Sequence, residues 1–517
     1  MKNIEERVAE LKAARDALKG GSLIGAQGKS RPPGKLSAQE RALELVDPGT
    51  FQELFPLAEH QCRDFGMDKV KIPHDGVITG QGKIDGRQVF IFSQDSTVAG
   101  GSVGVVHAQK ICQIMDLAVS TGVAIIGLLD SVGARMQEGI GAYNYGSIFA
   151  RTARASGSVP QISAIMGTCV GGAVYAPAMT DFIIMVENTS TMFITGPPVI
   201  KAVMGEEISK EELGGPKVHF QKTGVVDFLV KNDSDCLKLI RQILSYLPAN
   251  SRENPPVFKK NEPLPDRDET LNSIVPTDSK KIYDMKQIIK KVLDPDSFLE
   301  VKAGFARNMI VGFGRLEGKS VGIVANQPSV LGGSIDINAA DKSARFIRVC
   351  DSFNIPLITF VDTPAYLPGI NQEHGGIIRH GSKMLFAYGE ATVPKITVVI
   401  RKSYGGGISA MCGIKSMGPD QLYAWPTAEI AIMGAEIAVN SLFRKQFEEA
   451  KDPEVLRKKM IEEYQEEYYN PLRLAQRWIL DDVIEPSETR PRLIQALDML
   501  SQKIEQRPLK KHGNIPL

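Results

Sequence analysis

The sequence is poor in the residues that build disulfide or metal frameworks. Its 517 residues include six cysteines and seven histidines. The cysteines form no C-x-x-C pair, and the histidines show no metal-ligand spacing. No apolar run reaches the roughly 18 residues of a membrane span, and the charged amino-terminal segment lacks the apolar stretch of a secretory signal. We therefore expect a cytoplasmic chain with no disulfide scaffold, no zinc ribbon and no metal of its own.

The sequence also lacks an excess of charge of either sign. It has 61 Lys+Arg against 60 Asp+Glu, a formal net charge of +1. Without a broad basic field, a nucleic-acid partner is not expected. Hydrophobic residues make up 43% and charged residues 23%, which is the mixture of a soluble globular protein. At roughly 100–200 residues per domain, the length predicts two to four domains.

Composition and periodicity predict the domain boundaries. Residues 1–49 read as a helical arm that includes a Gly/Pro/Lys-rich stretch, Gly20 to Lys35, and residues 248–281 read as a polar, proline-rich linker. Two domains are left, 50–247 and 282–517. In the first, short apolar runs alternate with helical stretches, as in an α/β layered fold. The expected strands are Val89–Phe92, Ala124–Leu129 and Ile162–Met166, and the expected helix between them is His107–Ser120.

An internal duplication is the most informative feature of the sequence. Features of the first domain recur in the second at an offset of 232 residues, and later at 234. Several matches in one register are improbable by chance, so we infer two copies of one domain. The matched features are Ile84-Asp85-Gly86 with Leu316-Glu317-Gly318, Gly100-Gly101-Ser102 with Gly332-Gly333-Ser334, Lys110 with Lys342, Asp130 with Asp362, and Gly171-Gly172 with Gly405-Gly406.

Each copy carries two glycine-bearing loops directly after apolar strands. The loops begin at Asp130 and Gly167 in the first copy, and at Asp362 and Arg401 in the second. A strand that runs through Gly-Gly into a helix leaves backbone N–H groups without partners at the helix start. Two such loops side by side can aim two N–H groups at one oxygen and form an oxyanion hole. The alternative is that the glycines only permit tight turns and close packing.

Conventional catalytic side chains are hard to find. Walker, dinucleotide, nucleophile-elbow and H-E-x-x-H patterns are absent. Asp130 and Asp362 end matching strands and are interpreted as loop anchors that bond backbone N–H groups rather than as general bases. His374 and His380 are interpreted as structural, and Cys169 and Cys412 as small buried residues. Many backbone donors without an acid–base pair suit a reaction whose base and electrophile arrive on a cofactor.

The sequence resembles the biotin-dependent acyl-CoA carboxyltransferases along nearly its whole length. The propionyl-CoA carboxylase β, methylmalonyl-CoA decarboxylase α and large transcarboxylase subunits are the most similar members. The matching stretches are Gly133-Ala134-Arg135-Met136-Gln137-Glu138-Gly139, Ser156 to Ile162, Met192 to Pro197, VGIVANQP from Val321 to Pro328, Gly375 to Gly381, Ala424 to Ala431 and the ending Lys510 to Leu517.

The resemblance implies a fold and an assembly. Members have two tandem crotonase-like (ββα spiral) domains, form dimers and usually assemble three dimers into a homohexamer. The CoA thioester binds the amino-terminal domain and biotin the carboxy-terminal domain, which face each other across a dimer interface. A carboxyl group moves between N1-carboxybiotin and the α-carbon of a short acyl-CoA, of the propionyl-CoA or methylmalonyl-CoA type, through an enolate.

The resemblance also implies site residues. Gly133 and Ala134 with Gly172 and Ala173 would hold the thioester oxygen. Ala365 and Tyr366 with Gly406 and Gly407 would hold the ureido oxygen of biotin. The substrate-binding positions are Gly100, Gly101, Ile408 and Ser409, of which Ser409 occupies a position that influences acyl choice.

Several residues depart from the family pattern. Val132 and Ala365 replace glycines, and Gly407-Ile408 stands where Ala-Tyr is usual. Ser96 and Ala99 replace two aromatics, which leads us to expect an acyl preference other than propionyl.

The chain lacks two other parts of such an enzyme. It has no A/V-M-K-M biotin-attachment sequence, since Lys286 lies in a poor match inside a predicted helix, and it has no ATP-grasp glycine loop. Biotin is therefore expected on a separate carrier protein or domain, with a biotin carboxylase or a membrane decarboxylase subunit as a further partner. Three alternatives stay open. They are a decarboxylase α subunit of a sodium-pumping complex, a crotonase-type hydratase or isomerase using Glu138, and a silent structural subunit.

Overall fold

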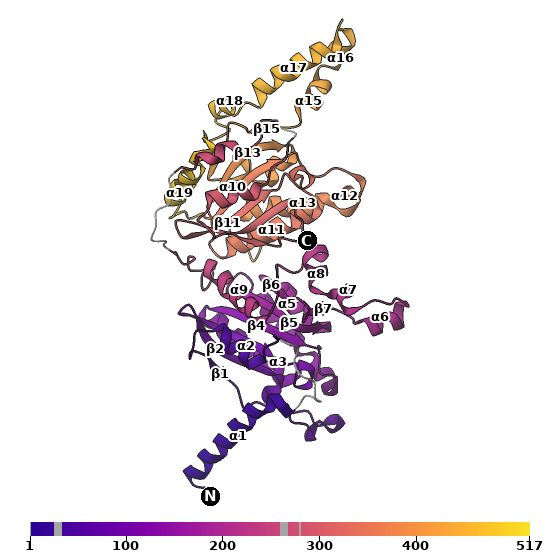
Figure 1. The fold of residues 1–517 in the computed structure, drawn as a ribbon, viewed down its shortest axis with the longest axis vertical. Helices are drawn as coiled ribbons and strands as arrows, with labels where there is room; N and C mark the ends of the chain where they lie inside the picture. Colours follow the sequence, from indigo (N-terminus) through magenta and orange to yellow (C-terminus); the bar gives the residue numbers. More distant parts are fainter. Residues whose placement is uncertain (1, 25–33, 259–266, 279–280) are drawn as a thin grey trace. The chain divides into compact units, whose positions relative to one another are not determined.

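The computed structural model describes residues 2–24, 34–258, 267–278 and 281–517, and it separates into two compact units (Figure 1). The first unit ends at Glu253 and the second begins at Asn254, a boundary that falls within the expected linker 248–281. Residues 259–266 and 279–280 of that linker, and residues 25–33 of the Gly/Pro/Lys-rich arm, lie outside the described residues.

The first unit alternates strands with helices, as the apolar pattern predicts. The expected strands and helix correspond to β3, β4, β5 and α3. The elements are α1 (Ile4–Ile24), α2 (Ala38–Leu45), β1 (Gln52–Leu54), η1 (Asp64–Lys69), η2 (Pro73–Gly76), β2 (Val77–Ile84), β3 (Arg87–Gln94), η3 (Ala99–Gly101), α3 (Val105–Thr121), β4 (Ala124–Ser131), η4 (Met136–Asn144), α4 (Tyr145–Ala155), β5 (Gln161–Val170), η5 (Gly171–Val174), α5 (Tyr175–Met179), β6 (Phe182–Val186), β7 (Thr191–Phe193), α6 (Pro197–Met204), α7 (Lys210–Gly214), α8 (Pro216–Val218), η6 (His219–Thr223), β8 (Phe228–Val230) and α9 (Asp233–Tyr246).

The second unit repeats this plan and adds helices near its end. Its elements are η7 (Glu269–Ser273), α10 (Met285–Val292), β9 (Leu299–Val301), β10 (Met309–Leu316), β11 (Lys319–Asn326), η8 (Leu331–Gly333), α11 (Ile337–Ser352), β12 (Leu357–Thr363), α12 (Ile370–Gly375), α13 (Ile377–Glu390), β13 (Lys395–Tyr404), α14 (Gly406–Ala410), η9 (Lys415–Met417), β14 (Gln421–Ala424), β15 (Glu429–Ala431), α15 (Ala435–Leu442), α16 (Arg444–Glu449), α17 (Pro453–Tyr468), α18 (Pro471–Gln476), β16 (Asp482–Val483), η10 (Pro486–Glu488) and α19 (Thr489–Met499).

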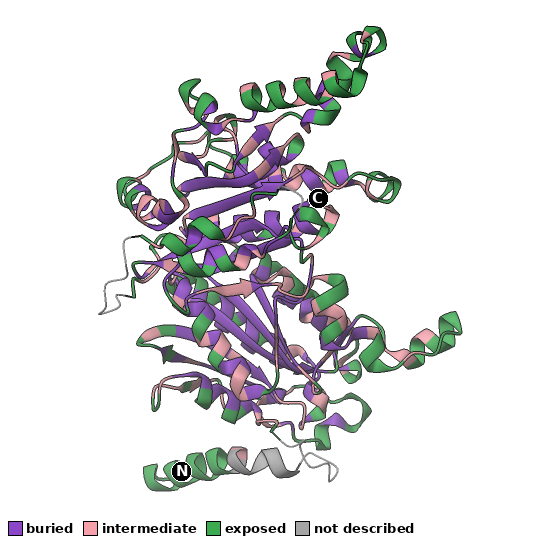
Figure 2. Ribbon diagram, turned by 45° about the horizontal axis from the view of Figure 1, so that its top comes forward, coloured by how far each residue is buried: buried purple, intermediate pink, exposed green. Residues whose placement is uncertain are grey.

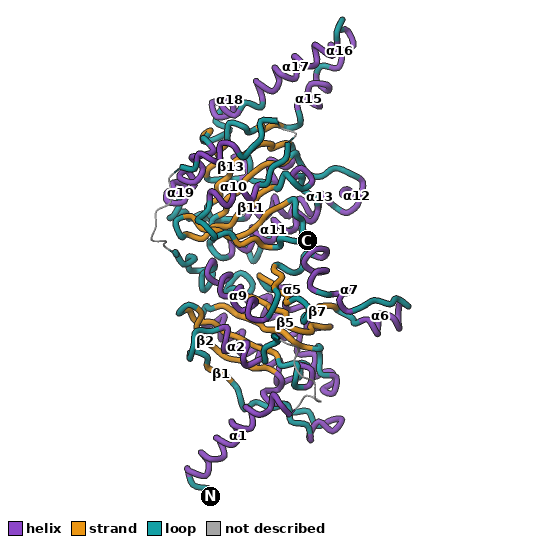
Figure 3. Tube along the Cα trace, in the orientation of Figure 1, coloured by secondary structure: helices purple, strands orange, loops and turns teal. Residues whose placement is uncertain are grey.

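Each unit is built on one sheet, whose strands are drawn in orange in Figure 3. Both sheets have eight strands and the same topology. The strand order is β1-β2-β3-β4-β5-β6-β8 in the first unit and β9-β10-β11-β12-β13-β14-β16 in the second. The eighth strand pairs in parallel with one central strand: β7 pairs with β5, and β15 pairs with β13. Pairing is antiparallel at the edge formed by the first three strands and parallel elsewhere, which is typical of an α/β layer whose crossovers are helical.

The duplication is preserved in backbone detail. The β2–β3 hairpin turns at Asp85 and Gly86, with φ of 49° and 78°, and the β10–β11 hairpin turns at Glu317 and Gly318, with φ of 48° and 77°. Positive φ at both turn residues defines a type I′ turn, whose twist matches that of the paired strands. The offset of 232 residues therefore describes a structural repeat.

Helices cover both faces of each sheet, so the central strands are buried (Figure 2). In the first unit, α3 and α4 contact each other over one face, and α2 and α9 contact each other over the other. Ser37 caps α2 in a capping box with Glu40. In the second unit, α10 and α19 pack on Ile358, Phe360 and their neighbours. This double covering explains why the strands read as continuous apolar runs.

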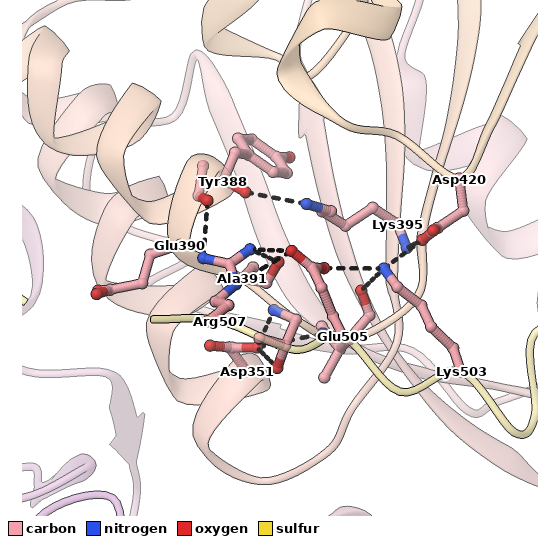
Figure 4. A network of polar contacts seen from close by, with 12 residues as sticks. Asp351, Tyr388, Glu390, Ala391, Lys395, Asp420, Lys503, Glu505 and Arg507 are labelled. Atoms are coloured by element: carbon pink, nitrogen blue, oxygen red, sulfur yellow. Dashed lines mark hydrogen bonds and ion pairs between the residues drawn. The ribbon is translucent and has the colours of Figure 1, made fainter. Parts of the chain in front are cut away.

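The segment after α19 is bound to the loop between α13 and β13 and to Asp420, which directly precedes β14 (Figure 4). The Lys503 ammonium donates to Asp420 at 2.8 Å and to the carbonyl of Val393 at 3.2 Å. The Arg507 guanidinium donates to the carbonyl of Ala391 at 3.1 Å and to Glu505 at 2.6 Å. These contacts lie at the amino-terminal end of β13, at the opposite end of that strand from its glycine loop.

A buried lysine repeats in both units at the same register. The Lys110 ammonium donates to the carbonyls of His74 and Val77. The Lys342 ammonium donates to four carbonyls, including those of Ala306 and Met309, at 2.7 to 3.3 Å. Burial lowers the pKa of Lys110 to about 8 and that of Lys342 to about 7. Each lysine thus connects an irregular segment to the first residue of the hairpin strand that follows that segment.

The lowered pKa of Lys342 predicts a pH dependence of stability. Between about pH 7 and 10 the unfolded chain holds a proton on this lysine that the folded chain has released, so folding becomes more favourable as the pH rises. We expect the difference in melting temperature between wild type and Lys342→Met to grow from pH 7 to about 8.5, measured by scanning fluorimetry. The exposed Lys290→Met is the control. A pH-independent difference would contradict the assignment.

Candidate functional site

The glycine loops of each unit lie beside one another because their strands are paired in the same register. In the first unit β4 and β5 pair Ser131 with Cys169, after an irregularity between Leu129 and Ser131. In the second unit β12 and β13 pair Thr363 with Ser403, after the same irregularity. Both loops therefore leave the sheet at its carboxyl edge, where ligands bind in open α/β sheets.

In the first unit, the main-chain amides of Ala134 and Gly172 have no partner among the described residues at this edge. Neighbouring amides are used, since Gly133 donates to Ser131 Oγ at 3.1 Å and Arg135 to the carbonyl of Val103 at 2.9 Å. Within the described residues the amide of Ala134 has no such bond. Gly172 is the second residue of η5 and precedes the first bond that a 3₁₀ turn can make. We call the N–H groups of Ala134 and Gly172 the first amide pair.

The second unit presents the corresponding amides. Leu367 donates to the carbonyl of Ile335 at 2.8 Å, and Ile408 to that of Gly405 at 3.2 Å. The amide of Tyr366 has no partner among the described residues, and Gly406 and Gly407 precede the first bond inside α14. We call the N–H groups of Tyr366 and Gly406 the second amide pair.

The repeat extends to the bridges that hold the loops. Val103 bridges Ala134, and Ile335 bridges Tyr366. The two amide pairs are therefore equivalent positions of the two copies.

The other sequence-predicted residues lie around these pairs. Ala173 follows Gly172 and is buried, as are Gly407 and Ile408, whereas Ser409 is half-buried. Gly101 is needed for close approach, because a Cβ there would lie 2.2 Å from the carbonyl oxygen of Asp130. Gly100 accepts the amide of Val132 at 3.1 Å. The site residues predicted for each domain copy thus lie at one edge of that copy's sheet.

A buried carboxylate anchors the first pair of loops. Asp130 accepts the amide of Thr168 at 3.2 Å, and its charge is balanced by Lys35 at 2.6 Å and Arg41 at 3.4 Å. Its own amide donates to Gln94 at 3.3 Å. Asp130 therefore joins the end of β4 to the end of β5, as the interpretation as a loop anchor predicts.

Asp362 does the same in the second unit with different partners. It accepts the amide of Lys402 at 3.1 Å, the hydroxyl of Tyr283 at 2.8 Å and the guanidinium of Arg401 at 3.0 Å. Its own amide donates to Asn326 at 3.1 Å. Burial raises the pKa of Asp362, and the adjacent Arg401 opposes that rise.

Glu138, the candidate carboxylate for hydratase chemistry, is fully engaged. It accepts the Arg135 guanidinium at 2.8 Å and the amide of Val105 at 2.6 Å. Arg135, which is buried, also donates to Asp75. A carboxylate held between an arginine and a main-chain amide supports the loop and is poorly suited to act as a base.

Cys169 and Cys412, interpreted as small buried residues, are both buried, whereas His374 is exposed. All six cysteines are free thiols. Burial raises the pKa of Cys169 and of Cys412 to about 12, so neither is a thiolate near neutral pH. His380 lies in α13 and contacts Asp341 at 2.7 Å. The next residue of α13, Gly381, lies beside the Tyr366 ring.

Among the described residues, no cluster of three His, Cys, Asp or Glu side chains is arranged to hold a metal ion. Across the same residues, every helix falls short of the length and apolar character that crossing a membrane requires.

A family model for the carboxyl transferase domain matches residues 29–515. The chain belongs to the carboxyl transferase domain family. It is 53% identical, over 99% of its length and 100% of the relative's, to the propionyl-CoA carboxylase carboxyltransferase subunit of Haloferax mediterranei. It is 49% identical, over 99% of both chains, to the methylmalonyl-CoA decarboxylase subunit alpha of Propionigenium modestum.

The same family appears among solved structures. The transcarboxylase 12S subunit, described as a hexamer with methylmalonyl-CoA and methylmalonic acid bound, superposes on this carboxyltransferase with a TM-score of 0.97 at 48% identity, covering 100% of this chain and 99% of that chain. The predicted α/β fold of two tandem crotonase-like domains and the predicted membership of the biotin-dependent acyl-CoA carboxyltransferases are therefore confirmed.

Sequence reasoning missed several residues that build this site. Lys35, Arg41 and Tyr283 lie far along the chain from the carboxylates they contact, and no local pattern links them. Tyr145 was missed as well, although its ring packs under Gly172. The sequence offered one signal for the surroundings of the two anchors. Gln94 and Asn326, which accept the amides of Asp130 and Asp362, recur at the offset of the duplication.

The anchoring role of Asp362 predicts a large effect on stability. In Asp362→Asn the buried Arg401 guanidinium loses its counterion, which typically costs about 3–5 kcal/mol. We expect the melting transition of the second unit to fall by several degrees in calorimetry. Asp341→Asn, at a half-exposed ion pair, should cost at most about 1 kcal/mol. Equal effects of the two substitutions would refute the anchor.

Proposed function

We propose that this carboxyltransferase moves a carboxyl group between N1-carboxybiotin on a carrier protein and the α-carbon of a short acyl-CoA of the propionyl-CoA or methylmalonyl-CoA type. The observation that carries the proposal is the pairing of unbonded amides at equivalent loops of both units. Relatives named for propionyl-CoA and methylmalonyl-CoA, with 53% and 49% identity, support the acyl class.

The first amide pair is assigned to the thioester. When the α-carbon loses a proton, or loses its carboxylate as CO₂, the electron pair left behind moves negative charge onto the thioester oxygen. Two N–H groups that are already in place stabilise that charge without reorganising solvent. Because the charge exists only along the reaction path, the amides of Ala134 and Gly172 favour the transition state over the ground state. Gly133 and Ala173 hold the backbone on either side.

The second amide pair is assigned to biotin. The donor set fits a ureido carbonyl, because the amides of Tyr366, Gly406 and Gly407 offer hydrogen-bond donors to a carbonyl oxygen. When bound, carboxylated biotin supplies the carboxyl group and the base for the α-proton. Residues of this chain orient the ureido oxygen through Tyr366 and Gly406, while Ala365 and Gly407 shape the backbone around them.

The position of Gly172 gives a direct test. In Gly172→Ala the new Cβ would lie 3.0 Å from the Tyr145 ring, so either the ring or the backbone that carries the Gly172 amide has to shift. We expect kcat for carboxyl transfer from methylmalonyl-CoA to biotin to fall by about 10²–10³-fold, the usual result of losing one such donor. The control is Gly146→Ala, where a Cβ meets no atom within 4 Å. Equal activity of the two variants would overturn the assignment.

Biotin is assigned to a separate carrier, because the chain has no attachment sequence. Lys286 lies in α10 and forms an ion pair with Glu300 at 2.7 Å. Calorimetry with the biotinylated carrier should give saturable binding that is at least tenfold weaker when the carrier lacks biotin. A biotinylated lysine found in this chain by mass spectrometry would contradict the proposal.

The direction of the reaction follows from the partners and not from this chain. A biotin carboxylase would supply carboxybiotin for acyl-CoA carboxylation, whereas a membrane decarboxylase subunit would consume it. The identity to decarboxylase α subunits favours the second arrangement as strongly as the identity to carboxylase subunits favours the first. We propose that the chain assembles as a homohexamer. We also place it in a reducing cytoplasm, which agrees with its six free cysteines.

The departures from the family pattern predict which acyl group the enzyme prefers. Ser96 and Ala99 carry no ring, so neither supplies the aromatic side chain that the family pattern has there. A panel of acetyl-, propionyl-, butyryl- and glutaryl-type CoA esters should therefore give a best substrate other than propionyl-CoA. A tenfold preference for propionyl-CoA over every other ester would contradict this expectation.

A further inference from the structure

One position next to the second amide pair holds an alanine in a backbone conformation that favours glycine. Ala365 has φ of 155°, a value that side-chain-bearing residues rarely adopt. Its carbonyl accepts the amide of Ile335 at 3.0 Å and the hydroxyl of Thr363 at 3.3 Å. A strained residue persists only where its surroundings hold it, so something must hold the peptide that links Ala365 to Tyr366.

The Tyr366 side chain is placed to do so. Its hydroxyl donates to the carbonyl of Gly381 in α13 at 3.0 Å. Burial raises the pKa of Tyr366 to about 12, so the hydroxyl keeps its proton near neutral pH and remains a donor. The residue that carries one amide of the pair is thus tied by its own side chain to a neighbouring helix.

The same ring also reaches the other amide of the pair. A Cβ on Gly406 would lie 3.2 Å from the Tyr366 ring, and a Cβ on Gly381 would lie 2.8 Å from it. The ring therefore occupies the space between α13 and the first residue of α14. The side chain of Tyr366 therefore lies beside the helix start that carries the Gly406 amide.

The loop also stands close to α14 on its other side. A Cβ on Gly407 would lie 2.9 Å from the Thr363 side chain and 3.2 Å from the Cα of Ala365. The missing side chain at Gly407 makes room for the strained loop. The loop is therefore held between a contact at Gly407 and the tether at Gly381.

The first unit supplies an independent comparison. Its residue equivalent to Tyr366 is Ala134, which has no ring to offer. Instead Tyr145, the first residue of α4, places its ring 3.0 Å from where a Cβ of Gly172 would lie. Both units thus set an aromatic ring against the helix-start glycine, from two different elements. This recurrence supports a positioning role for the ring beside each amide pair.

We propose that Tyr366 is a positioning residue for the half-reaction at the second amide pair, and that its hydroxyl holds the strained Ala365–Tyr366 peptide against α13. The proposal rests on the proposed function for its kinetic consequences. It makes the tyrosine and the alanine a coupled pair, because a glycine at position 365 adopts the same backbone without strain and has less need of the tether.

The kinetic test uses the full chain, methylmalonyl-CoA and free biotin. Tyr366→Phe keeps the ring and removes the hydroxyl. We expect kcat/KM for biotin to fall about tenfold, the usual size for one lost neutral hydrogen bond, with KM for methylmalonyl-CoA unchanged. Ala365→Gly added to Tyr366→Phe should restore kcat/KM to within threefold of wild type. The matched control is Tyr388→Phe, which removes a buried α13 hydroxyl bonded to Thr359 at 2.7 Å.

Several results would overturn the proposal. These are wild-type kinetics in Tyr366→Phe, an equal loss for both substrates, an equal loss in Tyr388→Phe, or no rescue by Ala365→Gly.

Hydrogen exchange separates this proposal from the proposed function. The amide of Leu367 donates to the carbonyl of Ile335 and reports on the loop in any enzyme, active or not. In Tyr366→Phe, exchange of the peptide containing Leu367 should speed up at least fivefold, and Ala365→Gly should reverse this. Unchanged exchange would overturn the positioning role. Absence of carboxyl transfer in the wild type, with faster exchange in the variant, would overturn only the proposed function.

Discussion

The structure depends on main-chain N–H groups that are held at the ends of strands without a bonding partner. A buried or half-buried amide normally finds a carbonyl, and leaving one free costs stability unless the surroundings are rigid. Here the rigidity comes from a buried carboxylate beneath each pair of loops. Asp130 and Asp362 each bond the amide of the adjacent strand and carry an ion pair that keeps them in place. The amides are thus fixed before any substrate arrives.

Duplication gave the fold two such sites, and each has changed separately since. The hairpin turns, the buried lysines and the loop register are the same in both copies. The side chains around each amide pair differ between the two copies. The carboxylate is balanced by Lys35 and Arg41 in one copy and by Arg401 in the other. The backbone plan was retained because it makes the amide pair, while the side chains around it were free to adapt to different reactants.

Much of the fold was predictable because it is encoded locally or repeated. Alternating apolar runs predict β3, β4 and β5, and the capping box of Ser37 predicts the start of α2. The repeated Asp-Gly and Glu-Gly turns predict the duplicated hairpin. The amide pairs followed from glycine loops after strands, although only Gly172 and Gly406 can be read directly as helix starts. The partners of the anchors could not be predicted, since Tyr283 reaches Asp362 across 79 residues of chain. The strain at Ala365 depends on backbone angles that no sequence pattern reveals.

The central claim is that the free N–H of Gly172 stabilises charge on the substrate oxygen. The most direct test replaces that N–H with an ester oxygen, by incorporating glycolic acid at position 172, so that no side chain changes. We predict a loss in kcat of about 10²–10³-fold with the melting temperature nearly unchanged, because the Gly172 amide makes no hydrogen bond to any described residue. A rate within threefold of the wild type would contradict the account.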